Sequence, residues 1–255
     1  MRVENFVGRI FLLRHVDRDK LNVDPEVREL PTELGEIQAF TMGSMLRRQF
    51  RAHFMRRMAS PAGRSLHTNE LLHRASLPLV ASRGQAGAQT LQKFRDLKED
   101  PRVDEAVQKE IHELGILGHG GEHLMLAMFT NPETYPDSRL AEFLTVKASE
   151  MTVAVNSIVE QMMLDEYRGT DTLVAGLHGG QLDFLHHHFT AEIFQGQPQR
   201  RTTKIFRKGE GFMLEALDLH PDLPADKEWR VGRVTELRWP LWLEEVCTEA
   251  MGGGS

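Results

Sequence analysis

Two histidines follow short apolar segments that lie far apart in the chain. Arg14 and His15 end the segment "RIFLLRH", and His178 ends the segment "TLVAGLH" just before two glycines. A neutral imidazole can act as a nucleophile and carry a phosphoryl group, while the planar fork of an arginine binds phosphate oxygens in pairs. These residue types predict a site for phosphoryl transfer.

A third segment supplies another arginine at the start of a predicted helix. In "ASPAGRS" a Ser-Pro turn opens the helix and places Arg64 in its first turn. The free N–H groups of a helix N-terminus favour an anion. Because the carboxyl ends of parallel strands lie at one edge of a sheet, His15, His178 and Arg64 can converge there.

Strands alternate with helices along the chain, which indicates a layered α/β domain. Strands are predicted within residues 9–15, 172–177, 208–219 and 228–239. Amphipathic helices are predicted over residues 32–50, from Pro61 to the Leu77–Pro78 break, and over 140–167. We expect one three-layer α/β/α sandwich with a mostly parallel central sheet over residues 1–250, a helical insertion at about 81–140, and a linker-like or tag-like tail at 251–255.

The composition excludes several classes of protein. The chain has 255 residues, 40% of them hydrophobic and 27% charged, as in ordinary globular domains. The net charge of −6 argues against a nucleic-acid partner, and no apolar segment approaches the roughly 20 residues of a membrane helix. The first ten residues have no signal-peptide pattern and Cys247 is the single cysteine, so we expect a cytoplasmic protein without disulfides.

Taken in order, these segments resemble the histidine phosphatase superfamily in its phosphoglycerate-mutase-like first branch. The matching segments, between about residues 7 and 241, are "FLLRH", "LPTELGEIQA", "ASPAGRSLHTNELL", "LVAGLHGG" and the two closing strands. The resemblance implies a phosphoglycerate-mutase-like fold and hydrolysis of a small phosphorylated metabolite through a phosphohistidine. It implies no metal and no other cofactor.

The resemblance also implies a role for individual residues. His15 would be the nucleophile, Arg14, Arg64 and His178 would hold the phosphoryl oxygens, and Arg18 and Asn22 would support the pocket. The family's acid usually follows the third strand, where this chain has "ASRGQAGAQ" with no carboxylate. An alkyl phosphate needs an acid to protonate its leaving oxygen, and the candidates are Glu122 first and then Asp96 and Glu99.

Alternatives remain open at this point. A phosphoglycerate-type mutase would use the same chemistry. A catalytically degenerate member that binds a phosphorylated ligand or a protein partner would fit the missing acid and Val16, which replaces the family's usual glycine after the nucleophile. A homodimer is possible, by analogy only. More distantly, "HGGEH" matches a zinc hydrolase pattern with His119, Glu122 and His123.

Two other groups of residues receive structural explanations. His186, His187 and His188 are consecutive, so on a helix they point in different directions and cannot converge on a metal. The basic segment from Arg47 to Arg57 is predicted as a solvated helix face rather than a nucleic-acid surface.

Overall fold

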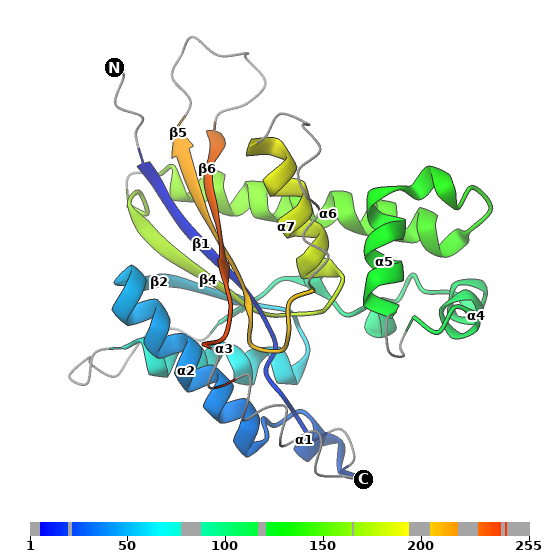
Figure 1. The fold of residues 1–255 in the computed structure, drawn as a ribbon, viewed down its shortest axis with the longest axis horizontal. Coiled ribbons are helices and arrows are strands. Elements are labelled where there is room, and N and C mark those ends of the chain that lie inside the picture. Colours follow the sequence, from blue (N-terminus) through cyan, green and yellow to red (C-terminus); the bar gives the residue numbers. More distant parts are fainter. Residues whose placement is uncertain are drawn as a thin grey trace.

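The computed structural model describes residues 6–19, 22–77, 88–116, 121–164, 166–193, 205–218, 229–240 and 243. Its centre is a six-stranded sheet with the order β3-β2-β4-β1-β5-β6 (Figure 1). The strands are β1 (Phe6–Arg14), β2 (Phe54–Ala59), β3 (Gln89–Thr90), β4 (Thr170–Leu177), β5 (Gly211–Asp218) and β6 (Trp229–Leu237). Strands β3, β2, β4 and β1 are mutually parallel, and β5 pairs antiparallel with both β1 and β6. The predicted mostly parallel sheet is confirmed.

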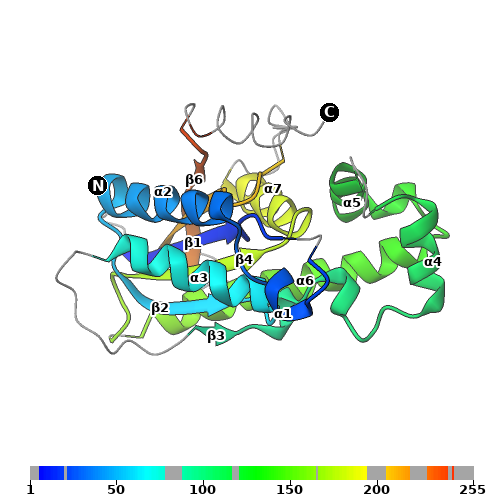
Figure 2. The ribbon, with the colours of Figure 1, turned by 90° about the horizontal axis from the view of Figure 1, so that it is seen from below.

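Helices cover both faces of the sheet. They are α1 (Pro25–Arg28), α2 (Glu33–Phe50), α3 (Gly63–Ser76), α4 (Glu105–Glu113), α5 (Gly121–Thr130), α6 (Arg139–Met162) and α7 (Gln181–Ile193). Short 3₁₀ turns lie at η1 (Gln92–Phe94), η2 (Leu97–Glu99) and η3 (Pro132–Thr134). Figures 1 and 2 show α2 and α3 on one face and α6 and α7 on the other, which is the expected three-layer sandwich.

The central strand β1 is buried on both faces, as a parallel strand between two helical layers should be. Ile10 and Leu12 pack with apolar residues of α6 and α7. Phe11 and Leu13 point the other way and pack with α2 and with Leu72 of α3. Side chains that alternate along β1 are therefore buried in the core on both faces of the sheet.

The basic segment from Arg47 to Arg57 is not one helix face, and that prediction is wrong. Helix α2 ends at Phe50, where Arg51 takes a left-handed conformation, and strand β2 begins at Phe54. Phe54 and Met58 are buried in the core, which favours a strand over a continued helix. Arg57 is itself buried and donates to Glu70 at 2.8 Å.

The segment between β3 and α6 contains α4, α5 and the three 3₁₀ turns. Helices α4 and α5 lie beyond the edge of the sheet, beside one end of α6 (Figure 1). Residues 81–87, at the start of the predicted insertion, lie outside the described residues. Among the described residues, no helix is long and apolar enough to cross a membrane.

A buried ion network ties this segment to α6. Lys147, on α6, is 1% exposed and donates to Asp100 at 2.8 Å. Asp100 also accepts from Arg102, which in turn donates to Glu150. Burial opposes ionisation, but the hydrogen bonds from Arg102 and Lys147 hold the pKa of Asp100 below its ordinary value. The contact between Lys147 and Asp100 therefore anchors the turn that carries Asp96 and Glu99 to α6.

Candidate active site

The two predicted histidines meet at the carboxyl edge of the sheet. Strands β1 and β4 are parallel neighbours whose last residues, Arg14 and Leu177, lie in register. His15 and His178 follow directly, and their ring centroids are 5.6 Å apart. Both rings are buried, with 8% and 7% of each residue exposed. The convergence predicted from the strand ends is present.

His15 is held in the neutral form that a nucleophile requires. Burial lowers its pKa well below the usual value, and the neighbouring His178, Arg14 and Arg64 lower it further. Its Nδ1 lies 2.9 Å from the carbonyl oxygen of Val16. Because a carbonyl can only accept a hydrogen bond, Nδ1 carries the proton and Nε2 keeps its lone pair. Of the two ring nitrogens, Nε2 is therefore the one that can act as a nucleophile.

His178 is neutral for the same reason. Burial lowers its pKa well below the usual value, and Arg64, Arg14, Arg18 and Lys147 add to the effect. Its Nε2 lies 3.3 Å from Ser60 Oγ, and its Nδ1 lies 3.7 Å from Asp96 Oδ2.

Arg14 lies at the end of β1 and is held from several sides. Its guanidinium donates to the carbonyl oxygen of Phe206 at 2.8 Å and to both carboxylate oxygens of Glu122. Glu122 comes from the first turn of α5. A Cβ atom at Gly179 would lie 2.3 Å from Glu122 Oε1 and 2.9 Å from Arg14 Cζ. A side chain at Gly179, in the β4–α7 turn, would therefore displace this ion pair from its present position.

Arg64 enters the pocket from the second residue of α3, as predicted. Helix α3 is fixed to β4 by Ser65, whose hydroxyl donates to the carbonyl oxygen of Gly176 at 2.6 Å. The Arg64 guanidinium is buried and donates to Asp96 at 2.5 Å and to Glu99 at 3.3 Å. Because Asp96 also approaches His178, Arg64 and His178 face the same space.

Arg18 also reaches the pocket, through a residue that the sequence reasoning missed. Glu29 accepts from Arg18 Nη1 at 2.5 Å and from Arg64 Nη1 at 3.3 Å. Its second oxygen accepts from the backbone N–H of Arg64 at 2.8 Å. Glu29 directly follows the four-residue helix α1. No local spacing relates it to Arg64, so its contact with Arg64 could not be predicted from the sequence.

In the part of the chain that the structure describes, each of the three pocket arginines has one N–H donor without a hydrogen-bond partner. Among the described residues, the Nε atoms of Arg14, Arg18 and Arg64 are buried with no hydrogen-bond partner. A buried unpaired donor is costly and is uncommon in folded proteins. Because all three guanidinium groups are close enough to lower the pKa of His178, an oxygen-rich anion is the kind of group that would satisfy these donors.

The side chains of Asn22 and Val16 do not contribute to the pocket. Asn22 hydrogen-bonds with Asp19 and Asp24 within its own loop, and no described contact joins it to the histidines. Val16 takes an ordinary backbone conformation, and its side chain is buried in the core layer between the sheet and α2. Its side chain thus belongs to the core rather than to the pocket.

All three candidate acids lie beside the pocket arginines. Glu122 pairs with Arg14, and Asp96 and Glu99 pair with Arg64. Asp96 alone of the three has a described contact to a pocket histidine. Geometry therefore favours Asp96 over Glu122, although the sequence alone ranked Glu122 first.

Neither group of histidines considered as a metal site forms a cluster among the described residues. His119 lies outside the described residues, and Glu122 is engaged with Arg14. His186, His187 and His188 are consecutive on α7, where the ring of His186 packs edge-on against Phe206 and Phe212. Over the described part of the chain, no three histidine, cysteine, aspartate or glutamate side chains are grouped to hold a metal ion.

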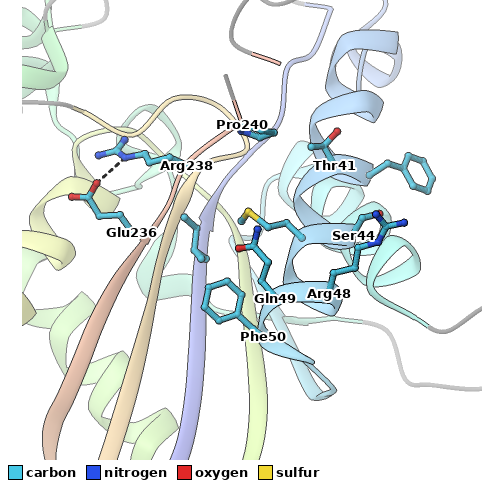
Figure 3. Close-up of a pocket in the computed structure, with 11 residues that line it drawn as sticks. Thr41, Ser44, Arg48, Gln49, Phe50, Glu236, Arg238 and Pro240 are labelled. Carbon is cyan, nitrogen blue, oxygen red and sulfur yellow. Dashed lines mark hydrogen bonds and ion pairs between the residues drawn. The ribbon is translucent and has the colours of Figure 1, made fainter. Parts of the chain in front are cut away.

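A hollow in the surface lies away from these residues. A groove of about 690 Å³ runs between α2 and the end of β6 (Figure 3). It is lined by apolar and polar side chains, including Phe40, Met45 and Arg48, and by the Glu236–Arg238 ion pair drawn in the figure. None of the predicted site residues lines it.

Solved structures resemble this one, although sequence comparisons find no relative. No protein-family model and no curated protein matches the chain. A phosphoglycerate mutase from Bacillus anthracis str. Sterne is similar at a TM-score of 0.51 and 15% identity, covering 83% of this chain and 88% of that one. A protein described as mycobacterial hydrolase 2 is similar at 0.52 and 16% identity, covering 96% and 98%.

A mycobacterial glucosyl-3-phosphoglycerate phosphatase with inorganic phosphate has a TM-score of 0.46 and 16% identity, covering 89% and 96%. At these identities the likeness concerns the fold. The six-stranded order, the two helical layers and the agreement with the mutase together confirm the predicted architecture. The chain has the phosphoglycerate-mutase-like α/β fold.

Proposed function

We propose that the protein is a phosphomonoesterase of the histidine phosphatase superfamily that acts through a phosphohistidine on His15. The observation that carries this proposal is the set of three buried Nε donors, on Arg14, Arg18 and Arg64, around two neutral histidines. Neutralising and positioning the phosphoryl oxygens is most of what phosphoryl transfer requires of a protein. The phosphoglycerate-mutase-like fold supports the same conclusion.

The reaction follows from the orientation of His15. Nε2 attacks phosphorus, the bond from phosphorus to the ester oxygen breaks, and an acid gives that oxygen its proton. Water then attacks the phosphohistidine, its proton passes to the carboxylate left by the acid, and inorganic phosphate leaves with His15 neutral again. Asp96 is the proposed acid because it is the one candidate with a described contact to a pocket histidine, His178.

The first test is turnover of p-nitrophenyl phosphate near pH 6 in the presence of a chelator. Wild type should turn over and should form an acid-labile phosphoenzyme, while His15→Asn should do neither. The matched control is His73→Asn, which alters another buried histidine at the far end of α3 and should keep its turnover. Well-folded wild type without turnover or phosphoenzyme would contradict the proposal and favour a degenerate binder.

The acid is identified by its dependence on the leaving group. Asp96→Asn should slow an alkyl phosphate far more than p-nitrophenyl phosphate, whose leaving group needs little protonation. Glu122→Gln should slow both equally, because it loses only its pairing with Arg14. The reverse pattern would return the role of acid to Glu122. Phosphate returned to a second hydroxyl instead of water would indicate a mutase.

A further inference from the structure

Glu29 occupies a set of donors that would otherwise suit an anion. Its carboxylate accepts from the Arg18 guanidinium, from the Arg64 guanidinium and from the Arg64 backbone N–H. The three donor distances lie between 2.5 and 3.3 Å. The residue belongs to the segment after α1, so it reaches α3 across the fold rather than along one helix.

The N-terminus of α3 has no anion of its own. Its N-cap residue is Ala62, which makes no side-chain cap, and its first turn contains no acidic residue. A helix of 14 residues favours negative charge at this end. Glu29 therefore supplies, from another element, the charge that a bound phosphate or carboxylate would supply.

The charge of the pocket is consequently not positive. Three guanidinium groups, of Arg14, Arg18 and Arg64, face four carboxylates, and each carboxylate lies within 3.3 Å of an arginine nitrogen. The acidic groups are those of Glu29, Asp96, Glu99 and Glu122, and with Asp96 protonated as the proposed acid the other three still balance the three arginines. The two histidines add no charge because their pKa values are lowered. The unfilled Nε donors can receive one phosphoryl group, whereas a second anionic group would meet carboxylates.

We propose that Glu29 is a specificity-determining residue, which selects phosphomonoesters whose leaving group is neutral or cationic over those whose leaving group carries a carboxylate or a second phosphate. The proposal rests on the phosphomonoesterase function proposed above. Its physical basis is that placing like charges side by side in a binding site costs enough to reject the wrong partner. The Glu29 side chain is 28% exposed, so it lies at the edge of the pocket.

The test compares two nearly isosteric probes, glycerol 3-phosphate and 3-phosphoglycerate, with phosphoethanolamine as the cationic case. Wild type should prefer glycerol 3-phosphate to 3-phosphoglycerate by roughly tenfold or more in kcat/KM. Phosphoethanolamine should serve at least as well as glycerol 3-phosphate. Glu29→Gln should reduce the preference by roughly tenfold, and Glu29→Asp, which keeps the charge, should preserve it.

The matched control is Glu70→Gln. Glu70 also bridges two arginines, Arg57 and Arg74, at 2.8 Å each, but it lies outside the pocket. Its substitution should leave the ratio of kcat/KM values unchanged. Raising the salt concentration should weaken the wild-type preference, because screening acts on an exposed charge.

Folded Glu29→Gln protein with an unchanged preference would overturn the proposal. Competition of each probe with vanadate for binding provides a second readout that does not require turnover. If wild type turns over no probe, the phosphomonoesterase proposal fails, whereas the Glu29 proposal still stands or falls on the ratio of binding affinities. Equal affinity of wild type for the carboxylate and hydroxyl probes would contradict it.

Discussion

The pocket and the Asp100–Lys147 network are both ion clusters inside the fold, yet they differ in completeness. Among the described residues, no side-chain nitrogen or oxygen of Asp100, Arg102, Lys147 or Glu150 is buried without a partner. In the pocket, every arginine has a buried Nε with none. The nitrogens and oxygens of the Asp100–Lys147 network are therefore already used inside the protein, whereas the pocket arginines keep three donors that an anion can fill.

The largest effect should come from breaking the closed network. Lys147→Met removes the buried ammonium group that pairs with the buried Asp100 carboxylate. The loss should lower the free energy of unfolding by about 3–5 kcal/mol. Urea denaturation followed by circular dichroism measures the change. Lys93→Met is the control, because Lys93 pairs with Glu150 of the same network but is 54% exposed. A loss below about 1 kcal/mol for Lys147→Met would remove the distinction between the two clusters.

The open cluster should respond in activity rather than in stability. Arg64→Gln removes a charged donor from the phosphoryl oxygens, and turnover of p-nitrophenyl phosphate should fall by about 10²–10³-fold. The free energy of unfolding should change less than for Lys147→Met, because the substitution also removes the buried Nε of Arg64, which has no hydrogen-bond partner among the described residues. Steady-state kinetics beside urea denaturation separates the two effects. Equal losses in both would mean that Arg64 is mainly structural.

Ligand binding should distinguish the clusters directly. An anion that binds only the folded state at 100 times its dissociation constant stabilises by about 2.7 kcal/mol. Vanadate should therefore raise the melting temperature of wild type and of Lys93→Met, and should not raise that of Arg64→Gln. Thermal denaturation at several vanadate concentrations measures this, and equal shifts in all three proteins would place the anion elsewhere.

Lowering the pH should reduce the free energy of unfolding, because the pocket histidines are neutral in the folded protein. The folded-state pKa values of His15 and His178 lie below the ordinary value of 6.5. Their contribution to stability is therefore complete above pH 6.5 and is lost as the pH falls from there, because the unfolded chain takes up protons first. The slope approaches about 1.4 kcal/mol per pH unit for each group. His15→Asn should reduce the slope between pH 6.5 and 5, and an unchanged slope would contradict burial of a neutral imidazole.

The smallest effect should come from an exposed ion pair. Arg74 is 66% exposed and pairs with Glu70, four residues before it on α3. Arg74→Gln should change the free energy of unfolding by less than about 1 kcal/mol, as expected for surface pairs. Urea denaturation checks it, and a loss as large as that of Lys147→Met would show that exposure does not rank these clusters.

The sequence predicted the parts of the site that strand and helix ends determine. His15 and His178 follow apolar strands, and Arg64 follows a Ser-Pro turn, so local pattern and the rules of parallel sheets were sufficient. Glu29 and Asp96 reach the pocket from irregular segments, where spacing carries no information on the final contact. The strand β2 was missed because arginines flank its apolar residues, and its burial depends on neighbours distant in sequence.

The pairing of β1 with β4 also determines when the pocket can exist. Arg9 and Asp171, which join these strands, are 162 residues apart. Contacts between residues so far apart in sequence form slowly, because the entropy of closing a large loop is lost before the contact can stabilise the chain. Helices α2 and α3 need no such closure. On this order of events, a chain emerging from the ribosome gains its helices early and brings His15 and His178 together only once β4 has been synthesised and docked.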